Sequence, residues 1–415
     1  MNINRRTALG VLSGGGLTSL ALAEPQSAAS PAPVPPPRGP SLGNLYPAIQ
    51  AYAQTLEPRY SFLNPQFTDL EKWSTGARAA YIQALSYRPE PCPLQARTIS
   101  RQARDGYRQE EVVFRSTAFA EVPASLLIPD KPLPSQAAII ALHDHGGFYY
   151  FGRQKMLEND AEEPRLTKFK QLLYDGAAFA ADYARAGYVV LAIDAFYFGE
   201  RRLMPGTLPP DKAKPVEELR KDSTAYIDAC NRLAGSYEDL TAKTIFLSGA
   251  TWPGVIVWDD MRSVDYLASR PEVDASRIGC VGLSLGGLRA GHLGGLDPRI
   301  RSTVVCCFMS ATKPMLRNDV EHHTWMLYTP GAASLLDLPD VASLTAPNWL
   351  LVQFGKKDAL FPAEGETAAA EKLSAIFRKA GVPDRFQPSF WDAPHSFPKP
   401  MQKEALDWFN KTLNS

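Results

Sequence analysis

Residues 277–287 have the sequence Arg-Ile-Gly-Cys-Val-Gly-Leu-Ser-Leu-Gly-Gly, which contains Gly-x-Ser-x-Gly. The apolar run before this pattern predicts a buried strand, and Leu285 to Gly294 predicts a helix after it. A serine in a tight turn between a strand and a helix is the setting in which the pattern supplies a nucleophile. A turn of small residues without catalytic meaning could have the same five letters. The flanking elements favour Ser284 as a nucleophile, with the Leu285 N–H as an oxyanion donor.

Apolar runs alternate with helical patterns along residues 107–415. Two strands joined by a turn are expected first, at 109–116 and 122–128. Buried strands follow at 137–142, 188–193, 277–282, 303–308 and 349–354, and a last strand at 385–391. Helices are expected at 177–186, 258–269, 285–294, 367–379 and 402–413. This order predicts an α/β fold with a mostly parallel central sheet and helices on both faces. Two interruptions, 196–250 and 311–345, are expected to form lids or pocket walls.

A serine hydroxyl needs a base beside it, and the base needs an acid that orients it. His395 follows the last predicted strand and precedes the final helix, so it is the candidate base. Asp358 follows the preceding strand and is the candidate acid. Asp392 competes for that role, but it lies too near His395 in sequence to reach its ring easily. His292, two turns into the helix after Ser284, is a poor candidate for the base.

The loop after the strand 137–142 has the sequence His143-Asp-His-Gly-Gly147. Glycines let a backbone approach a substrate carbonyl closely. We expect the Gly147 N–H to be the second oxyanion donor, with the Gly146 N–H as the alternative. His143 and His145 could instead be metal ligands, but the spacing offers no third ligand. We therefore predict neither a metal nor a cofactor, and we expect the two histidines to brace the loop.

Several longer motifs resemble those of a known group of enzymes. They are residues 142–147, 194–201, 258–274 and 277–287. Together with the order Ser284, Asp358, His395, they resemble the α/β-hydrolase superfamily, and more narrowly its acetyl xylan esterase-like and dienelactone hydrolase-like branch of exported bacterial proteins. The resemblance covers about residues 107–415 and implies the α/β-hydrolase fold. Dienelactone hydrolases proper carry cysteine where this chain has Ser284, so their substrate is not implied.

The resemblance implies hydrolysis of a carboxylic ester, either a small one or one linked to a carbohydrate, through an acyl-enzyme. A serine peptidase of the prolyl-oligopeptidase-like type is the first alternative, because Gly-x-Ser-x-Gly-Gly also occurs there. Such peptidases usually carry a large N-terminal propeller, and residues 41–105 are too few for one. A non-catalytic member of the fold is the second alternative. Such members typically lack a triad residue, whereas all three positions are filled here.

The N-terminal segment has the features of an export signal. Arg5 and Arg6 precede an apolar run at 8–23 that ends in a small-x-small pattern. We predict a signal peptide of twin-arginine type at 1–23, a Pro/Ala-rich linker at 24–40, an N-terminal helical extension at 41–106 and the catalytic domain at 107–415. The protein is then periplasmic or secreted, with no stable membrane anchor after cleavage. An ordinary secretory signal and a retained anchor are the alternatives.

The bulk composition excludes some partners. The chain has 44 basic and 44 acidic residues, so nothing favours a nucleic acid or an anionic membrane. The sequence does not indicate an oligomeric state. Of the five cysteines, Cys280, Cys306 and Cys307 lie in predicted buried strands, which leaves Cys92 and Cys230 as the pair that could form a disulfide.

Four further groups of residues could serve either the site or the fold. Asp194, Glu200, Arg201 and Arg202 could line a pocket entrance or form structural ion pairs. Tyr149, Tyr150, Trp252 and Trp325 could form an aromatic wall for a substrate or simply pack. Asp259, Arg262 and Asp265 lie at helical spacing and are expected to brace the fold, and His322 and His323 are expected to form a lid or surface pair.

Overall fold

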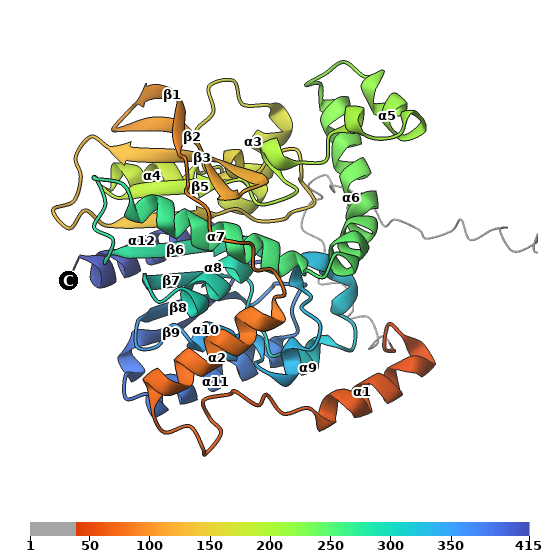
Figure 1. Cartoon of the computed structure of the whole chain (residues 1–415), viewed down its shortest axis with the longest axis vertical. Helices are drawn as coiled ribbons and strands as arrows, with labels where there is room; N and C mark the ends of the chain where they lie inside the picture. The colour runs from red at the N-terminus through yellow and green to blue at the C-terminus, as the bar shows by residue number, and fades with distance from the viewer. Residues whose placement is uncertain (1–38, 415) are drawn as a thin grey trace, which may run out of the picture. The chain divides into compact units, whose positions relative to one another are not determined.

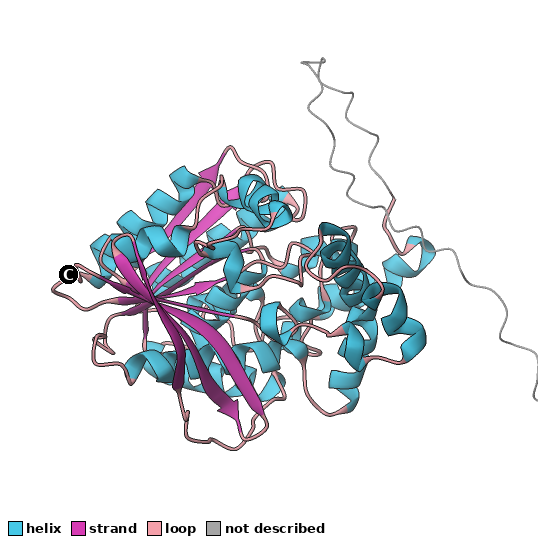
Figure 2. Cartoon of the chain, turned by 90° about the horizontal axis from the view of Figure 1, so that it is seen from above, coloured by secondary structure: helices cyan, strands magenta, loops and turns pink. Residues whose placement is uncertain are grey.

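The centre of the molecule is a nine-stranded sheet with the order β1-β2-β3-β5-β4-β6-β7-β8-β9 (Figures 1 and 2). The computed structural model describes residues 39–414. The strands are β1 Arg97–Arg104, β2 Tyr107–Thr117, β3 Ala120–Pro129, β4 Ala138–Leu142, β5 Val189–Ile193, β6 Ile278–Leu283, β7 Ile300–Cys306, β8 Trp349–Gly355 and β9 Phe386–Trp391. The first three are antiparallel, and β4 to β9 run parallel. The predicted α/β fold is confirmed.

Helices cover both faces of the sheet (Figure 2). Strands β4, β5 and β6 are buried along their whole length, which explains their unbroken apolar sequences. One core contains apolar side chains of α7 Trp252–Ala268, α8 Leu285–Leu296 and α11 Ala363–Lys379. A second core contains those of α4 Phe179–Arg185 and α12 Lys399–Leu413, beside α3 Pro164–Tyr174. Short 3-10 turns lie at Gly43–Leu45, Arg153–Met156, Gly199–Arg201, Pro205–Thr207, Val320–His322, Trp325–Leu327, Ala332–Ser334 and Pro383–Arg385.

The N-terminal extension differs in part from expectation. Helices α1 Tyr46–Thr55 and α2 Leu70–Ala84 form as predicted, and Asp69 caps α2 by accepting from the Lys72 N–H. Strand β1, however, lies inside the stretch 41–106 that was expected to be helical. Most of its residues are exposed, because it forms the edge of the sheet. An edge strand with little burial has no alternation of apolar residues, so sequence patterning misses it.

Helix α2 packs directly against α8, the helix that follows Ser284. The Tyr81 hydroxyl lies 3.0 Å from His292 Nε2, and His292 Nδ1 lies 2.8 Å from the Leu288 carbonyl oxygen. Arg78 donates to the carbonyl oxygens of Gly295 and Leu344 at 2.8 and 2.6 Å. His292 is buried, and this burial lowers its pKa. Its side chain therefore holds the extension to α8.

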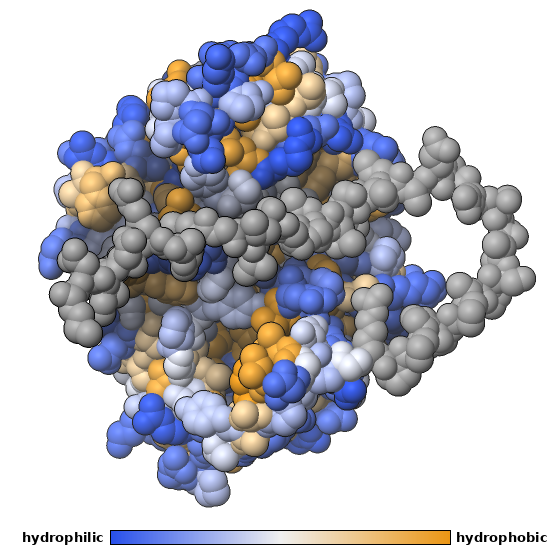
Figure 3. Space-filling model, turned by 90° about the vertical axis from the view of Figure 1, so that its right-hand side faces the viewer, coloured by the Kyte–Doolittle hydropathy of each residue, from blue (hydrophilic) through white to orange (hydrophobic). Residues whose placement is uncertain are grey.

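The two interruptions of the alternating pattern carry helices of their own. The first contains α5 Pro210–Glu217 and α6 Thr224–Leu247, and the second contains α9 Thr312–Met315 and α10 Leu338–Ser343. Helices α5 and α6 stand at the right of Figure 1. Figure 3 views that side and shows hydrophobic patches within a mainly hydrophilic surface. Exposed Leu240 and Leu247 lie on α6.

Some sequence expectations fall on residues that the structure leaves undescribed. The predicted signal peptide at 1–23 and the linker up to residue 38 lie outside the described residues. Within residues 39–414, no helix combines the length and apolarity that a membrane crossing requires. Cys92 and Cys230, the pair that the sequence left as a possible disulfide, are both free thiols in the structure.

Candidate active site

Ser284 occupies the sharp turn between β6 and α8, at φ 58° and ψ −123°. A non-glycine residue rarely adopts this conformation, and such strain is typical of functional positions. The turn requires glycine on either side. A Cβ on Gly282 would lie 2.4 Å from the Gly286 backbone, and a Cβ on Gly286 would lie 2.0 Å from the Leu142 carbonyl oxygen. The backbone at the end of β4 therefore lies in close contact with the turn that contains Ser284. Ser284 is 9% exposed.

Asp358 and His395 meet beyond the ends of β8 and β9. His395 Nδ1 lies 2.6 Å from Asp358 Oδ2, and Asp358 Oδ1 accepts the Leu360 N–H at 2.9 Å. The Asp358 side chain is fully buried, whereas that of His395 is 18% exposed. Because the Nδ1–H donates to the carboxylate, Nε2 carries no proton and is free to accept one. Asp392, the competing acid, is exposed and pairs with Lys357 instead.

Glycine also brings the His395 loop close to β8. A Cβ on Gly355 would lie 2.8 Å from the Ala393 carbonyl oxygen and 3.0 Å from that of Pro394. Cys307, which follows β7, adds a thiol here. Cys307, Asp358 and His395 each place one possible metal-ligand atom within 4.8 Å of the others, the one such group within residues 39–414. The Asp358–His395 hydrogen bond already accounts for two of its three members.

The loop after β4 contains the two glycine N–H groups that were named as candidate oxyanion donors, and their hydrogen bonding differs. The Gly147 N–H donates to His145 Nδ1 at 3.0 Å, so it is already engaged. The Gly146 N–H, the alternative, has no acceptor within the described part of the chain. Leu285 is the first residue of α8, and its N–H has no partner inside the helix. The N–H groups of Leu285 and Gly146 are therefore not engaged by an acceptor in the described part of the chain, whereas that of Gly147 is.

The same loop is braced by a buried charge that the sequence did not reveal. The fully buried Lys155 donates to the carbonyl oxygens of Asp144 and His145 at 2.9 and 3.0 Å, and it pairs with the Asp144 carboxylate at 3.3 Å. Burial lowers the pKa of Lys155. The ring of His143 uses both nitrogens, one against the Asp144 carbonyl and one accepting from the Ala195 N–H. The loop beside Ser284 is thus held by buried polar contacts from several directions.

A model of the dienelactone hydrolase family matches residues 175–411, which is more than half of the chain. The chain belongs to the dienelactone hydrolase family. A second model, described as an abhydrolase family, matches residues 44–204. A Bacillus subtilis (strain 168) protein, YtaP, which is named as a hydrolase by inference, is 25% identical over 337 residues. The match covers 81% of this chain and 98% of YtaP. Family membership places the chain among the carboxylic ester hydrolases.

Solved structures with similar folds include several esterases. A Bacteroides fragilis protein described as an acetyl xylan esterase has a TM-score of 0.62 at 19% identity, covering 84% of this chain and 82% of its own. The glucuronoyl esterase from Solibacter usitatus has a TM-score of 0.57 at 14% identity, covering 86% of this chain and 97% of its own. At these identities the likeness shows the α/β-hydrolase fold.

In this dienelactone hydrolase family member, the charged residues after β5 form ion pairs. The buried Arg153 pairs with Asp194, Glu111 and Glu200. Arg201 pairs with Asp259 at 2.7 Å. These contacts favour the structural reading of Asp194, Glu200, Arg201 and Asp259, and Arg202 lies over the Tyr150 ring. Arg262 and Asp265 pair within α7, as expected for residues that brace the fold.

The aromatic residues divide into packing residues and neighbours of His395. Trp252 is fully buried and packs on Tyr197, with ring centroids 5.1 Å apart. A cluster of rings is formed by Phe308, Phe361 and His323. The ring centroids of Phe361 and His395 are 6.5 Å apart. His323 belongs to the second insertion, and its Nε2 lies 3.1 Å from the Leu360 carbonyl oxygen. Burial lowers its pKa to about 4, so it is neutral near pH 7. The second insertion therefore places a neutral ring near the dyad.

Glu366 is a buried carboxyl group in the first turn of α11, close enough to Asp358 to feel its charge. Burial, with a contribution from the negative charge of Asp358, raises its pKa to about 8, whereas the ordinary value is 4.5. Between these values the folded protein holds a proton that the unfolded chain has lost, so stability falls as the pH rises from 4.5 to 8. We expect Glu366→Gln to be more stable than the wild type at pH 8 and similar to it at pH 4.5, as measured by urea unfolding. An equal difference at both pH values would contradict this.

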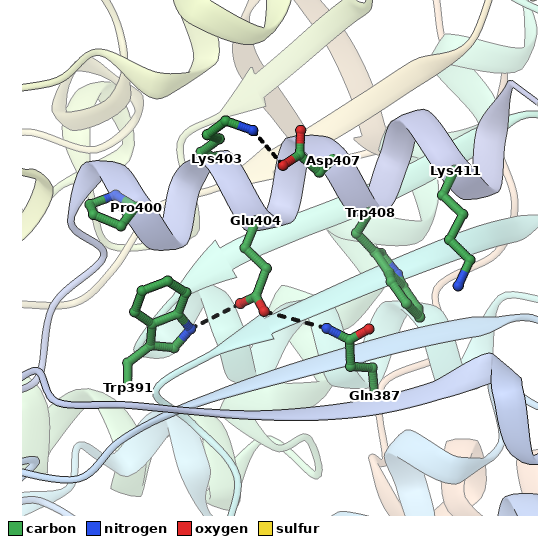
Figure 4. A pocket seen from close by; sticks show the side chains of 8 residues that line it. All are labelled: Gln387, Trp391, Pro400, Lys403, Glu404, Asp407, Trp408 and Lys411. Carbon is green, nitrogen blue, oxygen red and sulfur yellow. Dashed lines mark hydrogen bonds and ion pairs between the residues drawn. The ribbon is translucent and has the colours of Figure 1, made fainter.

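A surface groove of about 500 Å³ lies between β9 and α12, and none of the predicted site residues line it (Figure 4). Its central carboxylate, Glu404, accepts from Trp391 at 2.9 Å and from Gln387 at 3.3 Å. It also accepts from Gln353 and Ser389. Glu404 is thus fully used in joining α12 to the edge of the sheet.

Proposed function

We propose that this protein is a serine carboxylic-ester hydrolase that acts through an acyl-enzyme. The observation that carries the proposal is the 2.6 Å contact between His395 Nδ1 and Asp358. It lies at the carboxyl ends of β8 and β9, and parallel strands bring those ends to the edge of the sheet where Ser284 follows β6. Nucleophile, base and acid then occupy one sheet edge in the chain order of α/β hydrolases.

The reaction follows from these groups. His395 Nε2 takes the Ser284 proton as Oγ attacks the ester carbonyl, and the Leu285 and Gly146 N–H groups stabilise the oxyanion. The imidazolium, stabilised by Asp358, gives its proton to the leaving alcohol, and an acyl-serine remains. His395 then takes a proton from water, whose oxygen attacks the acyl carbon. Collapse of the second intermediate releases the acid and returns the proton to Ser284.

We infer that the acyl group is small, as in an acetyl ester, and that the alcohol can be a carbohydrate. Ser284 is 9% exposed. One apolar cluster includes the first turn of α8, which directly follows Ser284. Its members include Leu285, Leu288, Phe308 and Phe361. Such surroundings favour a short uncharged acyl group. Two proteins of similar fold are described as an acetyl xylan esterase and a glucuronoyl esterase, which supports a carbohydrate ester.

A panel of substrates tests this proposal. We expect kcat/KM to be highest for p-nitrophenyl acetate and to fall through the butanoate to the octanoate, because the longer chains must open the apolar cluster. Acetylated xylan should release acetate, and p-nitroacetanilide should not be turned over measurably. Preference for the octanoate would contradict the small acyl group. Amide hydrolysis at a rate near that of the ester would favour the serine peptidase alternative.

A further inference from the structure

Glu238, on helix α6 of the first insertion, joins three separate segments through one carboxylate. It accepts from His145 Nε2 at 2.7 Å, from the Tyr149 hydroxyl at 2.9 Å and from the Thr324 hydroxyl at 3.1 Å. His145 and Tyr149 belong to the loop after β4, and Thr324 belongs to the second insertion. The Glu238 side chain is 13% exposed. Both insertions and the loop beside Ser284 therefore meet at this side chain.

The contact with Glu238 fixes the state of the His145 ring. Nδ1 accepts the Gly147 N–H, so it carries no proton, and Nε2 must be the nitrogen that donates to Glu238. Burial raises the pKa of Glu238, but its contacts with His145, Tyr149 and Thr324 lower it by more, so the pKa lies below its usual value. The carboxylate is therefore ionised at neutral pH and holds the Nε2–H tautomer in place.

This fixed ring holds the loop that supplies an oxyanion donor. The Gly147 N–H points to His145, so the ring determines how the peptides at 146 and 147 are turned. Both glycines have φ in the left-handed region, at +55° and +63°, where a chain without restraint has many alternatives. His143 leads into the loop, and a Cβ on Gly286 would lie 3.1 Å from its carbonyl oxygen. A shift of His145 would therefore reach the peptide that faces the serine turn.

We propose that Glu238 is a positioning residue for ester hydrolysis, acting through His145 to hold the oxyanion loop at the point where the two insertions meet. This inference rests on the proposed function. Glu238 contributes a carboxylate from the first insertion, and Thr324 contributes the contact that ties the second insertion to it. The contacts of the two insertions at Glu238 thus complete the alignment of the loop that carries the oxyanion donor.

Kinetics of three variants test this proposal. Removing one oxyanion donor costs about 10²–10³-fold in kcat, so misaligning one should cost somewhat less. We expect Glu238→Ala to lower kcat for p-nitrophenyl acetate about 10–100-fold with KM changed less than about 3-fold. Glu238→Gln should recover part of the loss, because the amide oxygen still accepts from His145. Asp239→Ala is the matched control: Asp239 is the next residue of α6, is exposed and pairs with Lys243. It should retain wild-type kinetics.

Active-site titration with a fluorophosphonate separates positioning from folding. The rate per titrated serine counts folded enzyme only. If Glu238 had a purely structural role, this rate would be the same in Glu238→Ala as in the wild type, and that result would overturn the proposal. Equal rates in the Ala and Gln variants would also overturn it. Ester hydrolysis that persists in Ser284→Ala would instead reject the proposed function. The ¹⁵N shifts of His145 in the wild type need no turnover, and they should show the Nε2–H tautomer. An Nδ1–H tautomer would overturn the proposal.

Discussion

Replacing Ser284 with alanine should abolish ester hydrolysis almost completely, with kcat falling by about 10⁶-fold, as in other hydrolases whose nucleophilic serine is removed. The variant keeps the turn but lacks the oxygen that bonds to the acyl carbon. Residual rates would reflect binding and oxyanion stabilisation alone. The measurement is kcat for p-nitrophenyl acetate at enzyme concentrations high enough to detect slow turnover.

Ser374→Ala is the matched control for this substitution. Ser374 lies on α11, and its hydroxyl donates to the Ala370 carbonyl oxygen within the same helix. Its loss should leave kcat unchanged. A Ser284→Ala protein that is folded and still hydrolyses the ester at more than a few per cent of the wild-type rate would show that another residue is the nucleophile.

Asp358→Asn should have the second-largest effect, a fall in kcat of about 10⁴-fold. The amide can donate to His395 Nδ1, which favours the tautomer with its proton on Nε2, the nitrogen that must accept from Ser284. The imidazolium formed during the reaction also loses its neighbouring negative charge. KM should change little, because Asp358 is buried behind the histidine and does not face the substrate.

Asp392→Asn makes the same chemical change three residues from His395. Asp392 is exposed and pairs with Lys357, so its loss should leave kcat within about twofold, the range expected for a surface ion pair. The reverse result, with Asp392→Asn severely impaired and Asp358→Asn active, would transfer the role of the acid to Asp392.

The sequence predicted the fold and the places of Ser284, Asp358 and His395 within it, because both depend on where strands end. Buried parallel strands have largely apolar sequences, and Ser284 and Asp358 each follow such a strand. His395 follows β9, a partly exposed strand that polar residues interrupt. The structure brings Asp358 and His395 into contact at the sheet edge where Ser284 lies. Their catalytic roles stay predictions until the variants are measured. Strand β1 was missed for the opposite reason, because exposed edge residues have no apolar pattern.

The surroundings of the site could not be predicted from the sequence. Lys155 and Glu238 are single charged residues in segments without a motif, and only the tertiary contacts show that they are buried against the loop after β4. The hydrogen bond of Gly147 could not be predicted either. Its N–H was expected to face the substrate, but His145, two residues earlier, folds back and accepts it. Such local hydrogen bonds depend on side-chain rotamers, which the sequence does not specify.

Ser284 is expected to be the nucleophile that carries the acyl group during turnover. Mass spectrometry of peptides from protein inactivated by a fluorophosphonate, which reacts with such a serine, identifies that residue. We predict one adduct per chain, located on Ser284, with ester hydrolysis lost in proportion to labelling and no labelling in Ser284→Ala. An adduct on another residue, or full hydrolysis by protein that is fully labelled at Ser284, would contradict the claim.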